Sequence, residues 1–121
     1  MSTRILYVDD EEDIREVALL ALELDPALEV RACSSGEAAF AVASTWTPAL
    51  VLLDVMMPVM DGPATLMKLR ELPQLEATPV VFITARTQAV ERDRLLALGA
   101  SGLIAKPFDP MTLAETVRTF L

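Results

Sequence analysis

Short apolar runs alternate with longer amphipathic segments along the whole chain. Apolar runs of this length, bounded by polar turns, are typical of strands buried on both faces of a parallel sheet. The segments between them repeat their apolar residues with the spacing of a helix. The alternation occurs five times in 121 residues, about once every 24 residues, which suits strand–helix units with short loops. The pattern therefore predicts an α/β domain.

Apolar spacing and capping residues place a helix after each predicted strand. In the first helix, apolar residues from Ile14 to Ala21 recur at intervals of three and four. Serine or aspartate before an apolar segment and glycine after one mark helix boundaries. The predicted helices are residues 12–24, residues 37–45 behind a capping box at Ser34–Glu37, Asp61 to Leu72, residues 88–98 ahead of Gly99, and Asp109 to Leu121.

The predicted fold is a doubly wound α/β domain, with a five-stranded parallel sheet and helices on both faces. We favour the flavodoxin-like strand order 2-1-3-4-5, because it makes neighbours of the four strands that end in polar residues. No linker, repeat or change in composition divides the chain. Residues 1–121 are therefore predicted to form a single domain.

The composition limits the functions open to this domain. A hydrophobic content of 53% and a mean hydropathy of +0.42 suit a sheet covered on both faces, but no apolar stretch approaches the roughly 20 residues of a membrane span. The net charge of −8 argues against direct nucleic-acid binding, which relies on basic patches. The first strand begins too early to leave room for a signal peptide. We expect a cytoplasmic protein with no membrane partner.

Histidine is absent, and Cys33 is the only cysteine. The absence of histidine excludes a histidine-containing catalytic triad and the usual zinc ligand sets. A phosphohistidine, if the chemistry needs one, must come from a partner. Cys33 lies in an apolar-leaning stretch and is predicted to be a small core residue.

Polar side chains follow four of the predicted strands directly. Asp9 and Asp10 follow the first strand, and Asp54, Thr84 and Lys106 follow the third, fourth and fifth. Ligands of open α/β sheets collect beyond the carboxyl ends of the strands. We therefore expect these side chains to form a site for a divalent cation and a phosphoryl group.

The three aspartates are the candidate metal ligands. Asp9 and Asp10 would point to opposite faces of a continuing strand, but a turn at the strand end allows both to approach one cation. Carboxylates placed together raise one another's pKa unless a cation neutralises them. Mg²⁺ is the cation that best suits one or two carboxylates, waters and a phosphate oxygen. The backbone carbonyl of Met56 is a further candidate ligand beside Asp54.

The remaining side chains suit phosphoryl transfer. Asp54 is the candidate nucleophile, which would form an aspartyl-phosphate. Lys106 is one of two lysines beside eight arginines, and its place between an apolar strand and Pro107 predicts that it enters the site. Its ammonium and the Thr84 hydroxyl would bind phosphoryl oxygens.

Each of these residues also has an ordinary structural interpretation. An aspartate after a strand is commonly a helix cap, which is our interpretation of Asp61, and a lone threonine or lysine there needs no ligand. Glu11 and Glu12 are interpreted as first-turn helix residues favoured by the helix dipole, with lining of the site as the alternative. Because such residues follow four strands at once, a shared binding site is favoured over four separate structural roles.

The chain resembles a response-regulator receiver domain along its whole length. The resemblance implies that Asp54 receives phosphate from a histidine of a sensor kinase or a histidine phosphotransfer protein. The order and spacing of the matching pieces make the resemblance specific. These pieces are Val8-Asp9-Asp10-Glu11, Leu53 to Pro58, Met60-Asp61-Gly62, Thr84-Ala85, Gly99-Ala100 and Lys106-Pro107-Phe108.

The resemblance also implies roles for single residues. Asp10, Asp54 and the Met56 carbonyl would bind Mg²⁺, and Asp9 would act mostly through water. Thr84 and Lys106 would contact the phosphoryl group. The peptide bond between Lys106 and Pro107 is expected to be cis.

Two departures from the family pattern concern the switch. Family members often carry Tyr or Phe three residues before the lysine, where this chain has Leu103. Ser101-Gly102 replaces acidic residues that support phosphorylation-driven dimers in many members, so a monomer and such a dimer both stay open. Met56 and Arg86 flank the expected phosphoryl position, and we hypothesise that they slow dephosphorylation.

The function that we expect is a phosphorylation-dependent signalling switch. It would catalyse only its own phosphorylation and slow dephosphorylation, and it would act on a downstream protein effector or output domain. The chain is either a single-domain regulator or a receiver excised from a larger one. The fourth helix, fifth strand and fifth helix are the expected partner surface, with Arg92, Arg94 and Arg118 as candidates.

Three other functions are alternatives for a domain of this kind. A magnesium-dependent phosphatase usually places Asp-x-Asp on its first strand and carries a cap domain, and neither is present. A flavin-binding module needs a phosphate loop where this chain has the acidic residues Asp9 to Glu12. The third alternative is a degenerate interaction domain that takes no phosphate. The presence of all five polar residues after the strands argues against it, but Leu103 in place of the usual aromatic residue leaves it open.

Overall fold

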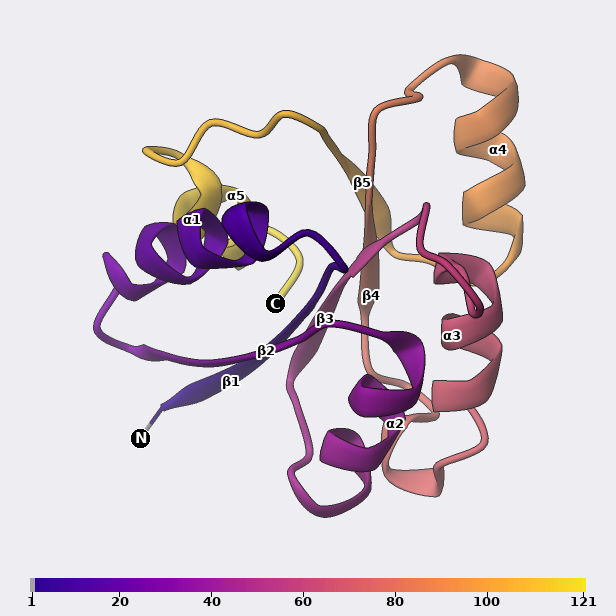
Figure 1. The fold of residues 1–121 in the computed structure, drawn as a ribbon, viewed down its shortest axis with the longest axis horizontal. Coiled ribbons are helices and arrows are strands. Elements are labelled where there is room, and N and C mark those ends of the chain that lie inside the picture. The colour runs from indigo at the N-terminus through magenta and orange to yellow at the C-terminus, as the bar shows by residue number, and fades with distance from the viewer. Residues whose placement is uncertain (1) are drawn as a thin grey trace.

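The structure, a computed structural model, describes residues 2–121 (Figure 1). Strands and α-helices alternate along this part of the chain, as the hydrophobic pattern predicted. The strands are β1 (Thr3–Val8), β2 (Leu28–Cys33), β3 (Leu50–Asp54), β4 (Val80–Thr84) and β5 (Gly102–Ala105). The helices are α1 (Glu12–Glu23), α2 (Gly36–Thr45), α3 (Gly62–Leu69), α4 (Ala89–Ala97) and α5 (Leu113–Arg118), with a short 3-10 helix η1 (Pro73–Leu75).

All strand pairs in the sheet are parallel, and the strand order is β2-β1-β3-β4-β5. This confirms the predicted fold class and order. The register places Val8 beside Leu53, so the residues that follow β1 and those at the end of β3 reach the same level. Thr84 likewise pairs with Ala105, which precedes Lys106. The polar strand ends therefore meet at one edge, where the strand order reverses between β1 and β3.

Helices cover both faces of the sheet (Figure 1). Helices α1 and α5 lie on one side, and α2, α3 and α4 lie on the other. Every residue of the inner strands β3 and β4 is buried, whereas the edge strand β2 exposes part of its length. This burial on two faces explains why the inner strands are continuous apolar runs rather than alternating ones. The alternate residues Ile5 and Tyr7 face one core, and Leu6 and Val8 face the other.

Helices α3 and α5 both end earlier than the sequence predicted. Helix α3 ends at Leu69 instead of continuing to Leu72, and Leu72 is extended (φ −82°, ψ 120°). A residue before proline is driven towards extended backbone, and Pro73 follows here. Helix α5 ends at Arg118, three residues before the predicted end.

Two helix starts differ as well. Asp109 does not cap α5, because its carboxylate accepts a hydrogen bond from the Met111 N–H (2.9 Å) and closes a turn, so the helix begins four residues later at Leu113. Helix α2 is capped by Ser35 rather than Ser34, and its hydroxyl accepts from the Ala38 N–H (3.1 Å). The predicted reciprocal role of Glu37 in a capping box is therefore wrong.

Arg70 binds the backbone at the amino-terminal ends of β4 and β5, opposite the polar strand ends. Its guanidinium donates to the backbone carbonyls of Leu75 (2.7 Å) and Thr78 (2.6 Å), which precede β4. A longer bond reaches the carbonyl of Gly99 (3.4 Å), which precedes β5. Gly99 has φ +104° and ends α4 in the way that the sequence predicted. Among the described residues, none of the helices is both long and apolar enough to span a membrane.

Candidate functional site

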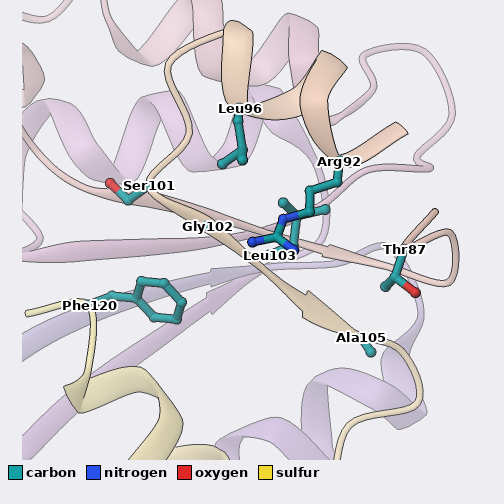
Figure 2. A pocket seen from close by; sticks show the side chains of 8 residues that line it. All are labelled: Thr87, Arg92, Leu96, Ser101, Gly102, Leu103, Ala105 and Phe120. Carbon is teal, nitrogen blue, oxygen red and sulfur yellow. The ribbon is translucent and has the colours of Figure 1, made fainter. Parts of the chain in front are cut away.

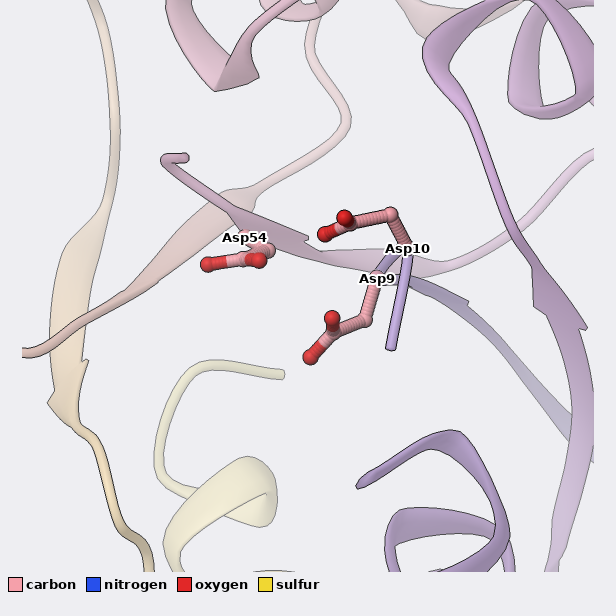
Figure 3. A group of neighbouring side chains, drawn as sticks. All are labelled: Asp9, Asp10 and Asp54. Carbon is pink, nitrogen blue, oxygen red and sulfur yellow. The ribbon is translucent and has the colours of Figure 1, made fainter. Parts of the chain in front are cut away.

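The structure brings Asp9, Asp10 and Asp54 together at the carboxyl edge of the sheet (Figure 3). One carboxylate oxygen of each aspartate lies within 4.8 Å of those of the other two. Asp9 and Asp54 are buried, and Asp10 is exposed. Because β1 ends at Val8, the backbone turns at the two adjacent aspartates, and both side chains can face Asp54.

Asp9 is the most completely bonded of the three aspartates. Its Oδ1 accepts from the backbone N–H of Glu11 (3.0 Å), and its Oδ2 accepts from the Tyr7 hydroxyl (3.1 Å). Arg15 donates to its backbone carbonyl (2.9 Å). Burial and the negative charge of Asp9 raise the pKa of Tyr7 far above its ordinary value, so the phenol stays protonated and donates.

Lys106 enters the site, as its place in the sequence predicted. Its Nζ lies 3.3 Å from Asp9 Oδ2, 3.4 Å from Asp54 Oδ2 and 3.5 Å from Glu11 Oε1. Burial by itself lowers the pKa of Lys106, but the charges of Asp54 and Asp9 outweigh it and leave the pKa above its ordinary value. The peptide bond to Pro107 is cis, in agreement with the expectation from the family pattern.

Asp54 carries a perturbed carboxyl group. Burial is the largest cause, followed by the charge of Asp9, and together they raise the pKa of Asp54 from 3.8 to about 6, against opposing contributions from Lys106 and the Met56 N–H. One ammonium does not neutralise this group of carboxylates. The donor set consists of carboxylate oxygens near a solvent-accessible opening, which fits Mg²⁺ better than a softer metal.

A cavity of about 390 Å³ opens over Asp54. Thr84, Met56 and Lys106 are among the residues that line it. Helix α3 begins directly behind Asp54, where a Cβ on Gly62 would lie 2.6 Å from the Asp54 carbonyl oxygen. Only glycine permits this close approach, and the carboxylate of Asp61 caps the helix through the Ala64 N–H (2.9 Å), as predicted.

Thr84 is buried at the end of β4, beside the cavity. Its hydroxyl accepts from the Arg86 N–H (3.0 Å) and lies 3.3 Å from the Arg86 carbonyl, to which it donates. The hydroxyl is therefore engaged with its own loop in this state. Met56 is exposed at the rim of the cavity, and Arg86 is exposed as well.

One residue of the site was not singled out from the sequence, and another was given a different first interpretation. Glu11 was interpreted first as a helix residue, with lining of the site as the alternative, and it lines the cavity and contacts Lys106. Tyr7 was treated only as part of an apolar run. A signal for Tyr7 does exist, because a residue two positions before Asp9 lies on the same face of the strand.

A second hollow, of about 490 Å³, lies between α4, β5 and Phe120, which follows α5 (Figure 2). Leu103 and the ring of Phe120 line it, and Arg92 reaches over it from α4. The ring of Phe120 lies so close to Gly102 that a Cβ there would be 2.4 Å from its Cε1. This is the surface on which a partner was expected.

The other two arginines considered for that surface are in ion pairs. Arg94 pairs with Glu91 on its own helix (2.5 Å), and Arg118 pairs with Asp25 in the loop after α1. Of the three predicted candidates, Arg92 is therefore the one that lines the hollow.

Comparison with known proteins matches residues 5–118 to the family model of the response regulator receiver domain. The chain is 38% identical over 117 residues to "Response regulator Rre1" of Synechocystis sp., covering 97% of this chain and 51% of that protein. It is 37% identical over 121 residues to "Transcriptional regulatory protein SrrA" of Staphylococcus aureus, covering 100% of this chain and 48% of that protein.

Solved structures agree with these matches. The chemotaxis protein CheY4 of Vibrio cholerae superposes with a TM-score of 0.93 at 32% identity, covering 100% of both chains. The chain spans about half the length of the curated relatives named above. Sequence, topology and the arrangement of polar strand ends thus agree: the chain belongs to the family of response regulator receiver domains of two-component signalling.

Proposed function

We propose that Asp54 accepts a phosphoryl group from a phosphohistidine of a partner, and that the chain thereby switches its affinity for a downstream protein. The observation that carries the proposal is the Asp54 carboxylate, which lies under an open cavity with Lys106 at 3.4 Å and two further carboxylates beside it. The described residues contain no histidine, so the donor imidazole is assigned to a sensor kinase or a phosphotransfer protein.

The proposed reaction is a displacement at phosphorus. A carboxylate oxygen of Asp54 attacks, the O–P bond forms, and the P–N bond breaks so that its electron pair returns to the donor imidazole. Asp10, Asp54 and the Met56 carbonyl are proposed to hold Mg²⁺, with Asp9 contributing mostly through water. When bound, Mg²⁺ supplies positive charge that offsets the charge of the transferring group.

Lys106 and Thr84 are proposed to bind the transferred group. Lys106 leaves its contacts with the carboxylates and places its ammonium against a phosphoryl oxygen. Thr84 exchanges its bond with the Arg86 carbonyl for a bond to another phosphoryl oxygen. That exchange would move the loop after β4 and so change the surface near α4. Hydrolysis by water would then restore Asp54.

The surface around the cavity indicates how a donor approaches. An apolar hollow of about 200 Å³ lies beside the cavity, lined by Ile14 and Val17 of α1 and by Phe108. Leu20 of α1 and Leu24, which directly follows the helix, are exposed apolar residues as well. A partner helix carrying the phosphohistidine can pack here while its imidazole reaches Asp54. The downstream partner is assigned to the surface over α4, β5 and α5.

Intact-mass spectrometry after incubation with acetyl phosphate tests the transfer. In the presence of Mg²⁺, we expect one added phosphoryl group on the parent chain and none on Asp54→Asn, because the amide cannot act as the nucleophile. Removal of Mg²⁺ with a chelator should abolish the addition.

Asp93→Asn is the matched control, because Asp93 is exposed on α4 and lies outside the site. It should be phosphorylated like the parent. Parent chain that binds Mg²⁺ but takes no phosphoryl group would contradict the proposal and favour a domain that works by docking alone.

A further inference from the structure

Tyr7 is a buried phenol whose hydroxyl reaches the functional site from the core. It is fully buried among Ile5, Leu22 and Leu113. Phenylalanine would fill the same space, so packing does not require the hydroxyl. The hydroxyl donates to Asp9 Oδ2 at 3.1 Å, the one hydrogen bond that Tyr7 makes through its side chain among the described residues.

The carboxylate of Asp9 accepts hydrogen bonds from three donors, two of which are held in fixed positions and one of which is flexible. The Glu11 N–H on Oδ1 and the Tyr7 hydroxyl on Oδ2 belong to groups fixed by the start of α1 and by β1. The third donor, Lys106, also serves Asp54 and Glu11 on a flexible stem. If Lys106 turns to a phosphoryl group, Oδ2 of Asp9 keeps Tyr7 as its fixed donor.

Loss of that donor would leave Asp9 Oδ2 with Lys106 alone, whose ammonium is shared with Asp54 and Glu11. A buried carboxylate oxygen with fewer hydrogen bonds costs free energy, and its carboxylate is held less firmly in one orientation. Ligand orientation at metal sites depends on hydrogen bonds of this kind from the surrounding residues.

We propose that Tyr7 is a positioning residue, which holds the Asp9 carboxylate beside Asp10 and Asp54 and thereby sets the affinity of the site for Mg²⁺. The inference rests on the proposed function, since it assumes that these three aspartates hold the metal. Tyr7 acts through Asp9 and does not contact the reacting groups.

Calorimetric titration of Mg²⁺ into four chains tests this inference: the parent, Tyr7→Phe, Asp9→Ala and the double variant. Tyr7→Phe should weaken Mg²⁺ binding about tenfold. In the Asp9→Ala background the same change should have no effect, because the group that Tyr7 positions is gone. Circular dichroism confirms that each chain is folded.

Thr65→Val is the matched control. Thr65 is also fully buried, and its hydroxyl donates to the Asp61 carbonyl (2.8 Å) away from the three aspartates, so its loss should leave Mg²⁺ affinity unchanged. Equal or tighter binding by Tyr7→Phe, or a loss that persists in the Asp9→Ala background, would overturn the inference while leaving the metal site intact. A parent chain that binds no Mg²⁺ would overturn both the inference and the metal site.

Discussion

One ammonium serves three carboxylates at the centre of this site. Lys106 lies within 3.5 Å of oxygens of Asp9, Asp54 and Glu11, while Asp10 adds a further negative charge nearby. The site therefore has a shortage of positive charge before any ligand binds. Asp54 shows the effect, because burial and Asp9 raise its pKa to about 6.

The raised pKa of Asp54 predicts a pH-dependent cost to stability. In the unfolded chain the carboxyl loses its proton near pH 3.8, whereas in the folded chain it does so near pH 6. The folded chain binds more protons in this window, so stability falls as pH rises through it. In metal-free buffer at pH 8, Asp54→Asn should be more stable than the parent by on the order of 2 kcal/mol.

Urea unfolding at several pH values measures this difference. The advantage of Asp54→Asn should shrink between pH 6 and pH 4, since the parent carboxyl regains its proton there. The exposed Asp93→Asn should give no such gap. An advantage that is constant with pH would show that burial of the charge is not its cause.

The candidate site residues were predictable where the chain placed a polar group after an apolar run. Asp9, Asp10, Asp54 and Lys106 were predicted in this way, and the structure brings them together. Tyr7 was not predictable by the same rule, because an aromatic residue inside a strand ordinarily fills the core. Strand alternation puts Tyr7 on the same face as Asp9, but it does not reveal that the hydroxyl and the carboxylate lie within hydrogen-bond distance.

Element boundaries depended on interactions that hydrophobic spacing does not encode. The strands and their order followed from apolar runs and from the need for polar ends to meet. Helix α5 starts late because the Asp109 carboxylate bonds the Met111 N–H, a competition between turn and helix that composition leaves open. Helix α3 ends early because Pro73 constrains the residue before it.

The loop between β3 and α3 contains a strained residue. Val59 has φ +68° and is 100% exposed, and the Met60 N–H donates to the Pro58 carbonyl (2.8 Å) across it. A three-residue turn with positive φ is unfavourable for a β-branched side chain. Val59→Gly should therefore stabilise the chain by about 1 kcal/mol, as relief of strain exceeds the added entropy of the unfolded glycine.

Thermal or urea unfolding measures the effect of Val59→Gly against Val90→Gly. Val90 is also exposed, but it lies in α4, where glycine lowers helix stability. The two identical changes should therefore have opposite signs. Destabilisation by both would show that the φ of Val59 carries no significant strain.

At the scale of the whole molecule, negative charge is unevenly placed. The net charge is −8, and several carboxylates gather at the carboxyl edge of the sheet, where β1 and β3 end. Folding brings these groups together, so a cation that binds only the folded chain must stabilise it. Monovalent salt screens such charges but does not occupy a site.

Mg²⁺ should raise the unfolding temperature of the parent chain more than NaCl of equal ionic strength. At 100 times its dissociation constant, a ligand specific to the folded state contributes roughly 2.7 kcal/mol. Asp10→Ala should lose most of this gain, because it removes a proposed ligand that is exposed and makes little contribution to packing. Differential scanning calorimetry in the two salts makes the comparison, and an equal rise in both would indicate general screening.

The guanidinium of Arg70 lies at the end of the sheet opposite Asp54. It joins α3 to the backbone just before β4 and just before β5, so the amino ends of both strands share one anchor. Thr84 and Lys106 lie at the other ends of the same strands. The hydrogen bonds of Arg70 thus tie the ends of β4 and β5 that lie farthest from Asp54. If Asp54 takes a phosphoryl group as proposed, we expect the resulting movement to occur in the loops after β4 and β5, on the side of the sheet that a second protein can contact.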